Sequence, residues 1–315
     1  MPASQSAAAR HLAAPVRQYQ NYEAALDAIA GYETALRENA GGRRARGLTV
    51  TDQDQPEEVF CLFPPHPLSP PLLIIGGMGP LAGAQAFRQA CARFRDSRAV
   101  VLYQACSMPD RSRIIAGSDT TACQEMASRL TRAIRFTIGL TDPVRGPARC
   151  IIACNSAHYF WPLLDDKLRQ TPSAWNCQVR MISLVDSTVE TLRRQSCKNT
   201  LVLTTEGARA GHVFSRPFRD AGIPFEEPSS TLSPLLTRAI FEGVKALDDS
   251  RAVRLGNRFF EAILRGGQDY DCVLAGCTEL PLIITLLQLR GSPKVTAFLS
   301  GVKIVNPLEE ALRRS

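Results

Sequence analysis

Two cysteines each follow a short apolar run and precede a group of polar residues. Cys154 ends the run in RCIIACNSAH (149–158), and Cys277 ends the run in CVLAGCTELP (272–281). A thiol in such a position can be a packed core residue, a metal ligand, half of a disulfide or a catalytic group. Because the same arrangement occurs once in each half of the chain, a shared chemical role is the hypothesis to test.

The cysteine and histidine content bears on two of these alternatives. Ten cysteines in 315 residues do not make a disulfide-stapled miniprotein, and the sequence has four histidines and no C-x-x-C pair. A zinc site is therefore not expected. The other eight cysteines are Cys61, Cys91, Cys106, Cys123, Cys150, Cys177, Cys197 and Cys272, and most of them are interpreted as reduced core residues in a cytosol-like compartment.

Composition and charge are those of an ordinary globular protein. The chain is 45% hydrophobic and 21% charged, enough to bury a core. No apolar run approaches the ~18 residues of a membrane span. The net charge is +7, but the only dense basic run is Arg43, Arg44 and Arg46, so neither a nucleic acid nor a membrane is an expected partner. The positive balance favours an anionic small substrate.

The main body alternates short apolar runs with helical patterns. Strands are predicted at 72–77, 99–105, 149–154, 179–185, 200–205, 272–277 and 303–307, with helices between them, including one around 208–220. Such alternation predicts an α/β fold with parallel sheets covered on both faces. Ligands bind beyond the carboxyl ends of strands in these folds, which is where Cys154 and Cys277 stand.

Residues 1–71 are predicted to be an extension of this body. Residues 20–40 have apolar positions at helical spacing, and Gly41 and Gly42 supply a stop signal. Residues 57–63 predict a strand, and PPHPLSPP (64–71) predicts a stiff connection. The first residues have no signal-peptide core, and a disordered tail is expected there rather than a targeting leader.

Five motifs in order resemble the aspartate/glutamate racemase superfamily, nearest to its aspartate racemase and broad amino-acid racemase branch. They are GGMGP (76–80), PDR (109–111), CNSAH (154–158), FEGVKA (241–246) and GCTELP (276–281). The resemblance covers about residues 72–315. It implies two pseudo-symmetric α/β lobes, each a parallel sheet flanked by helices, with the active site in the cleft between them. Lobe 1 is expected at 72–182 plus 293–315, and lobe 2 at 183–292.

The resemblance also implies racemisation of aspartate or glutamate without pyridoxal phosphate, any other cofactor or a metal. One group removes the proton from one face of the α-carbon, and a second group protonates the opposite face. Cys154 and Cys277 are interpreted as this pair, because a thiol titrates near neutral pH. His158, four residues after Cys154, is a candidate for tuning the thiol or a structural histidine bonded to a backbone carbonyl.

Further residues match family positions that contact the substrate. Arg111 and Lys245 match positions that bind substrate carboxylates. The backbone of Met78 and Gly79 is expected to close over the substrate. Asn155, Ser156 and Thr278 can donate hydrogen bonds to a carboxylate or thiolate, and Thr205 is a weaker candidate; helix capping is the alternative for Ser156 and Thr278.

Departures from the family pattern put the exact substrate in doubt. Ser156 stands where Thr is usual, Gly83 and Ala208 also replace Thr, and Asn306 stands where many relatives have Asp. The alternatives are another reaction of the superfamily (hydantoin racemisation, maleate isomerisation or arylmalonate decarboxylation) or a non-catalytic binding or secreted effector protein. Members are often dimers, so the resemblance makes a homodimer a candidate assembly.

Overall fold

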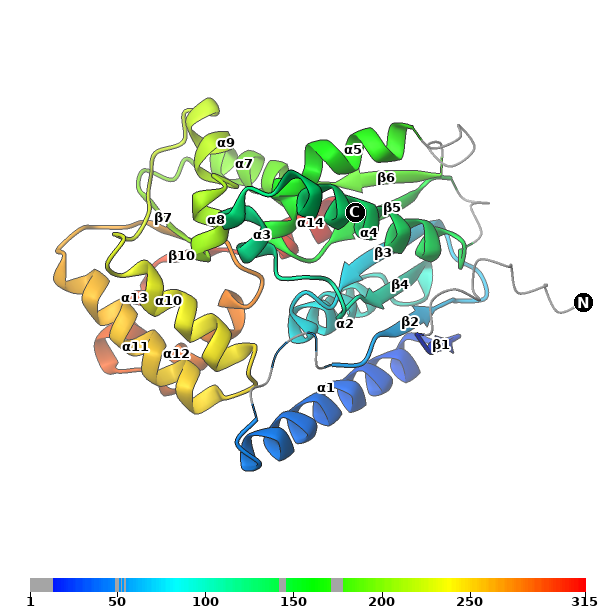
Figure 1. Ribbon diagram of the computed structural model, residues 1–315, viewed down its shortest axis with the longest axis horizontal. Helices are drawn as coiled ribbons and strands as arrows, with labels where there is room; N and C mark the ends of the chain where they lie inside the picture. Colours follow the sequence, from blue (N-terminus) through cyan, green and yellow to red (C-terminus); the bar gives the residue numbers. More distant parts are fainter. Residues whose placement is uncertain (1–13, 49–50, 52, 54, 142–145, 171–177) are drawn as a thin grey trace, which may run out of the picture.

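The computed structural model describes residues 14–48, 51, 53, 55–141, 146–170 and 178–315. It confirms the predicted α/β class, because helices cover both faces of two separate sheets (Figure 1). Within the described residues, no helix combines the length and the apolar character that crossing a bilayer requires. Residues 1–13 of the expected N-terminal tail and Cys177 lie outside the described residues, whereas Val16–Tyr19, where the tail was also expected, form a strand.

The first sheet has six strands in the order β1-β2-β4-β3-β5-β6. All neighbouring strands are parallel except β2 and β4, which pair antiparallel with Phe60 opposite Leu102. The strands are β1 (Val16–Tyr19), β2 (Glu58–Leu62), β3 (Ser69–Gly76), β4 (Arg98–Gln104), β5 (Ala148–Ile152) and β6 (Val179–Ile182). The strand predicted at 57–63 therefore joins the sheet of the first lobe.

Alternate residues of these strands enter different cores, as the two-residue period of a strand requires. Leu72 and Ile74 of β3 face one core with α1 (Tyr22–Ala45) and α2 (Pro80–Phe94). Leu73 and Ile75 face the other core with α4 (Thr120–Ile138) and α5 (Trp161–Arg169). Both faces of the sheet are thus buried, which explains why β3 reads as a continuous apolar run.

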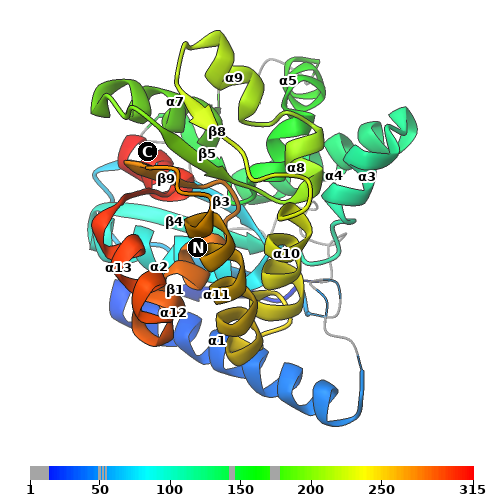
Figure 2. The same cartoon turned by 90° about the vertical axis from the view of Figure 1, so that its left-hand side faces the viewer.

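The second sheet has four parallel strands in the order β10-β9-β7-β8. They are β7 (Thr200–Leu203), β8 (Phe225–Glu226), β9 (Cys272–Ala275) and β10 (Lys303–Val305). One face packs on α7 (Leu184–Gln195) and α9 (Ser215–Asp220). The other packs on α10 (Ser233–Arg238), α11 (Asp249–Arg265), α12 (Leu280–Arg290) and α13 (Pro293–Gly301) (Figure 2).

The C-terminal segment connects the two lobes. Although residues 293–315 were expected with the first lobe, β10 pairs with β9, with Ile304 opposite Val273, and so extends the second sheet. The following helix α14 (Pro307–Arg314) packs against both α7 and α2. Asn306, one of the departures from the family pattern, caps α14 by accepting a hydrogen bond from the backbone of Leu308 at 3.2 Å.

Two helix predictions were wrong in their bounds. Helix α1 continues through Gly41 and Gly42, because a glycine in an uncrowded helix position weakens a helix without ending it. The chain leaves the helix at Gly47, whose φ is +71°. The helix expected around 208–220 is two short ones, α8 (Glu206–Ala210) and α9, separated by a turn in which His212 has a φ of 53°.

Candidate active site

Neighbouring strands deliver the motifs to one place. The loop containing Met78 follows β3, and Cys154 follows β5, which is the neighbour of β3. In the second lobe, Thr205 follows β7 and Cys277 follows its neighbour β9. Parallel strands end at the same edge of a sheet, so each lobe gathers two loops at its carboxyl edge.

The two edges meet around one small cavity. Nearly all of the residues predicted for the site line it together, and only Gly79 and His158 do not. The cavity volume is about 10 Å³, which leaves room for about one water molecule. The lining residues are Met78, Arg111, Ser112, Cys154, Asn155, Ser156, Thr205, Phe241, Lys245, Cys277, Thr278 and Glu279. The lobes are therefore in a closed arrangement.

Cys154 is held by the turn that follows it. It precedes the 3₁₀ turn η5 (Asn155–Phe160), and the side chain is 5% exposed. Its backbone carbonyl accepts hydrogen bonds from the backbone of Ala157 at 3.2 Å and from Nδ1 of His158 at 3.1 Å. The thiol thus projects from a fixed backbone at the end of β5.

His158 bonds to backbone atoms through both ring nitrogens. Nδ1 contacts the Cys154 carbonyl, so it carries the proton, and Nε2 accepts a hydrogen bond from the backbone of Leu184 at 3.0 Å. Burial lowers the pKa of His158 to about 4, and the ring stacks on Trp161 with 5.0 Å between centroids. A neutral His158 therefore positions Cys154 through its carbonyl and spans from η5 to the start of α7.

Cys277 lies beside an acidic residue that the sequence analysis did not single out. Its Sγ donates a hydrogen bond to Oε2 of Glu279 at 2.9 Å, and Glu279 is only 2% exposed. Burial raises the pKa of the Cys277 thiol well above its usual value, the charge of Glu279 raises it further, and Lys245 opposes both. Cys277 is accordingly a protonated thiol at neutral pH.

The two predicted cations approach the cavity from different lobes. Arg111 begins α3 (Arg111–Gly117), and Lys245 follows the π-helical turn η6 (Ala239–Val244). Nη2 of Arg111 and Nζ of Lys245 donate hydrogen bonds to the Met78 carbonyl at 2.7 and 2.9 Å. The chain through FEGVKA thus forms a π-helical turn, a feature that recurs at functional sites.

The polar residues of the cavity differ in how they are satisfied. Asn155 is 1% exposed, and both of its amide atoms lack a hydrogen-bond partner within the described residues. A buried amide without partners is costly, so this side chain is suited to a polar ligand. The other polar residues have partners. Ser156 Oγ lies 3.5 Å from Oγ1 of Thr205 in the other lobe, and Thr205 caps α8. The hydroxyl of Thr278 donates a hydrogen bond to Glu279 at 3.2 Å.

Gly79 lies behind the cavity, against Glu279. A Cβ at this position would stand 1.5 Å from Glu279 Oε1, so only glycine allows the carboxylate to reach Cys277. Gly77 has a φ of +83° and passes over the backbone of Ala105, where a Cβ would come within 2.3 Å. In GGMGP, Gly79 therefore allows the chain to approach Glu279 closely, and Gly77 allows it to approach Ala105 closely.

Three cavity residues were missed by the sequence analysis: Ser112, Phe241 and Glu279. Each lies inside or beside a motif that was recognised, and Glu279 is the first acid after Cys277. An acid placed two residues after a strand-end thiol was the available signal. Within the described ranges, no group of three His, Cys, Asp or Glu side chains is arranged to hold a metal ion.

Comparison with known proteins agrees with the fold described above. Three solved structures are similar over most of their length. An aspartate racemase from Picrophilus torridus is 18% identical, with a TM-score of 0.57, and the match covers 78% of this chain and 92% of that chain. An aspartate racemase homologue from Pyrococcus horikoshii OT3 is 19% identical, with a TM-score of 0.51 and coverages of 78% and 96%.

A glutamate racemase isoform from Bacillus anthracis is 14% identical, with a TM-score of 0.51 and coverages of 79% and 80%. At these identities the similarity concerns the fold. The family described as Asp/Glu/Hydantoin racemase matches residues 75–313, most of the chain and all the residues that line the cavity. This chain therefore belongs to the Asp/Glu/Hydantoin racemase family.

Proposed function

We propose that this protein is a cofactor-independent racemase that interconverts the L and D forms of an acidic amino acid, aspartate or glutamate. The observation that carries the proposal is that Cys154 and Cys277, which come from different lobes, line the same cavity. Two acid–base groups on opposite sides of one α-carbon are what a proton exchange with inversion needs.

The substrate is held through its carboxylates. Arg111 and Lys245 are buried and approach the cavity together, so they can bind a carboxylate and offset the negative charge that develops when the α-proton leaves. The amide of Asn155 supplies both a donor and an acceptor. A dicarboxylic amino acid offers two carboxylates to the donors of Arg111, Lys245 and Asn155, whereas a neutral amino acid offers one.

The two thiols act in opposite protonation states. In one direction the Cys154 thiolate removes the α-proton, and the Cys277 thiol delivers its proton to the opposite face of the carbanion. The hydrogen bond from Cys277 to Glu279 supports this assignment for the described state, because it favours the protonated thiol. In the other direction the roles reverse, and Lys245 offsets the charge of the Cys277 thiolate beside Glu279.

Exchange in deuterium oxide tests the proposal. Purified protein is incubated with L-aspartate or L-glutamate, and the α-hydrogen is followed by NMR and the enantiomer by chiral chromatography. Two bases predict that the D product carries solvent deuterium while the remaining L substrate keeps its proton at early times. Absence of exchange with aspartate and glutamate would refute this assignment of substrate, and absence of exchange with the other protein amino acids and with longer α-amino dicarboxylic acids as well would refute the racemase activity.

The residue assignment is tested separately. Cys154→Ser and Cys277→Ser are each expected to lower the rate of racemisation by about a thousandfold, because a serine hydroxyl is a far weaker acid than a thiol. Cys123→Ser is the matched control, since this cysteine lies on α4 and does not line the cavity. Full racemisation by either site variant would contradict the assignment.

A further inference from the structure

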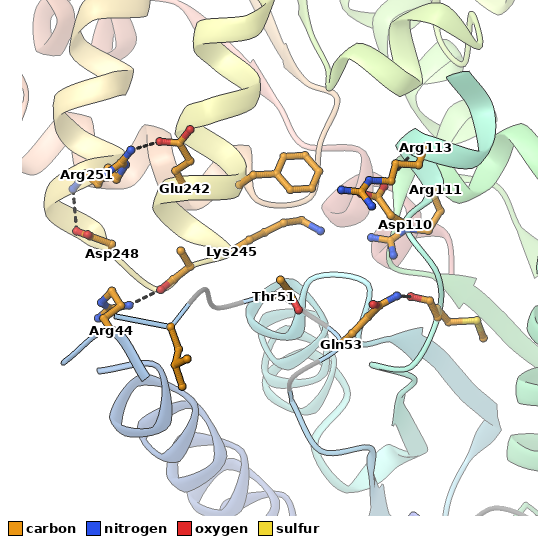
Figure 3. Close-up of a pocket in the computed structure, with 14 residues that line it drawn as sticks. Arg44, Thr51, Gln53, Asp110, Arg111, Arg113, Glu242, Lys245, Asp248 and Arg251 are labelled. Carbon is orange, nitrogen blue, oxygen red and sulfur yellow. Dashed lines mark hydrogen bonds and ion pairs between the residues drawn. The ribbon is translucent and has the colours of Figure 1, made fainter. Parts of the chain in front are cut away.

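A second and much larger space adjoins the cysteine cavity. This chamber has a volume of about 560 Å³ and shares Arg111, Phe241 and Lys245 with the cavity (Figure 3). Part of its wall comes from residues that precede the family match at 75–313, including Arg44 and Leu48. The N-terminal extension thus contributes part of the wall of this chamber.

The extension is fixed to both lobes where it forms this wall. Arg44, near the end of α1, donates a hydrogen bond to the backbone carbonyl of Ala246 in the second lobe. Gln53 donates to the carbonyl of Met108 in the first lobe at 3.3 Å (Figure 3). Earlier in α1, Arg37 forms an ion pair with Asp249 at 3.1 Å. These contacts tie the described residues of the extension to both lobes.

The acids that line the chamber are engaged with other groups. Glu242 pairs with Arg238 and Arg251. Asp248 caps α11 by accepting a hydrogen bond from the backbone of Arg251 at 2.9 Å. Asp110 likewise caps α3, and its contact with the guanidinium of Arg113 is long, at 4.0 Å.

Cationic side chains from both lobes converge on the chamber, and two of them, Arg111 and Lys245, also donate hydrogen bonds to the Met78 carbonyl. Lys245 points from the second lobe toward Arg111 and Arg113 of the first lobe across the chamber (Figure 3). Like charges that face one another lower their repulsion by taking up an anion between them. The side chain of Arg113 is 90% exposed, so it is open to a ligand that enters from solvent.

We propose, on the basis of the racemase function above, that the chamber receives the distal acidic group of an amino acid longer than glutamate. The class is an α-amino dicarboxylic acid such as α-aminoadipate or α-aminopimelate. The chamber adjoins the cysteine cavity at Arg111, Phe241 and Lys245, so a long side chain extends past Lys245 into the chamber. Leu48, Met108 and Phe241 offer apolar contacts to its methylene groups, and Arg113 binds the terminal carboxylate.

A substrate series tests the assignment of Arg113. α-Hydrogen exchange is measured for aspartate, glutamate, α-aminoadipate, α-aminopimelate and norleucine, which resembles α-aminoadipate but lacks the distal charge. Wild-type kcat/KM for α-aminoadipate is expected to exceed that for norleucine by at least about tenfold, and Arg113→Gln is expected to remove most of this preference. Arg113→Lys should retain part of it, and Arg258→Gln, an exposed arginine outside the chamber, should retain all.

The contribution of the extension is tested by adding a charge to its wall. Leu48 is 47% exposed, so Leu48→Asp is compatible with folding and places a carboxylate in the chamber. It should weaken α-aminopimelate binding, measured by calorimetry, by about tenfold through like-charge repulsion. Leu289→Asp is the matched control, because Leu289 is 75% exposed and does not line the chamber.

The outcomes separate this inference from the proposed function. Racemisation of aspartate with no gain for the longer diacids, or an equal loss for all substrates in Arg113→Gln, overturns the chamber assignment and leaves the racemase. Calorimetric binding of α-aminopimelate that depends on Arg113 and Leu48, without any exchange, refutes the racemase and supports the chamber. The absence of both binding and exchange refutes the racemase function and the chamber assignment together.

Discussion

The thiol of Cys277 donates a hydrogen bond to the buried carboxylate of Glu279 at 2.9 Å. This contact makes the two candidate acid–base groups unequal, because the backbone of Cys154 is held by His158, whereas the thiol of Cys277 itself is bonded to an acid. Gly79 completes the arrangement, since any larger residue would occupy the position of the Glu279 carboxylate.

Glu279→Gln is expected to lower the pKa of Cys277. The carboxylate disfavours a neighbouring thiolate, and a neutral amide of the same shape removes that charge while keeping the volume. Any limb of the pH–rate profile that reports Cys277 should therefore move to lower pH, whether this cysteine acts as acid or as base. The measurement is kcat/KM against pH in both directions of racemisation.

A direct titration provides the control for this prediction. The thiolate absorbance in the ultraviolet is compared between each protein and the same protein carrying Cys277→Ser, so that the difference isolates one thiol. A Cys277 titration that stays in place or moves to higher pH in Glu279→Gln would show that Glu279 does not set its pKa.

The cavity could be predicted from the sequence to the extent that its motifs are contiguous. Cys154, Asn155 and Ser156 follow one strand, and Cys277 and Thr278 follow another, so a strand-end rule locates them. The hydrogen bond between Cys277 and Glu279 was not predictable in the same way. It depends on the close approach of Gly79 from the other lobe, a contact that no local pattern records.

In the fold, too, contacts between segments distant in the sequence could not be predicted. Apolar runs predicted most strands of both sheets, but they did not predict β1 or β8, and they did not predict which strands are neighbours in space. Strand β10 has three residues, and its pairing with β9 follows from how the lobes pack rather than from its own composition. The antiparallel pairing of β2 with β4 likewise joins residues about 40 positions apart, so the extension appeared separable in the sequence.

Acid is expected to destabilise the fold through His158. Burial holds its pKa at about 4 in the folded state, below the ordinary value of 6.5, while Asp186 opposes this shift. The unfolded state therefore binds the proton first as the pH falls, so stability is lost progressively between about pH 6.5 and pH 4. The contribution is about 3 kcal/mol over this window.

Denaturant unfolding at several pH values measures this effect. His158→Gln cannot titrate, so its free energy of unfolding should fall less steeply with decreasing pH than that of the wild type, whatever its stability at neutral pH. His66→Gln is the matched control, since His66 is exposed and lies in the connection between β2 and β3. Equal slopes for wild type and His158→Gln would contradict the prediction.

Gly207→Ala is expected to disturb the closed arrangement of the lobes. Gly207 is the second residue of α8 in the second lobe, and an added Cβ would stand 2.4 Å from Cα of Ser112 in α3 of the first lobe. Backbone must move to relieve this contact, at a cost of about 1–3 kcal/mol in the free energy of unfolding. Because Ser112 and the neighbouring Arg111 line the cavity, kcat should fall as well.

The matched control is a glycine without neighbours. Gly31 lies in α1 with nothing within 4 Å of an added Cβ, so Gly31→Ala should raise the free energy of unfolding by about 0.5–1 kcal/mol and leave kcat unchanged. Denaturant unfolding and racemisation assays on both variants check the pair. A Gly207→Ala protein with wild-type stability and kcat would show that the lobes separate there without cost.

Phe60→Ala is expected to destabilise the whole molecule, although Phe60 precedes the family match. The ring is fully buried in β2, and its centroid lies 5.2 Å from Tyr32 of α1 and 6.2 Å from Phe87 of α2. Removing it leaves a cavity between the extension and the first lobe, at a cost of about 3–5 kcal/mol. Denaturant unfolding should keep one transition at a lower midpoint, whereas Val16→Ala, at a 38% exposed position of β1, should change little. An early separate transition that leaves racemisation intact would mean that the extension folds independently, and the wall it gives the chamber would then be dispensable for the catalytic lobes.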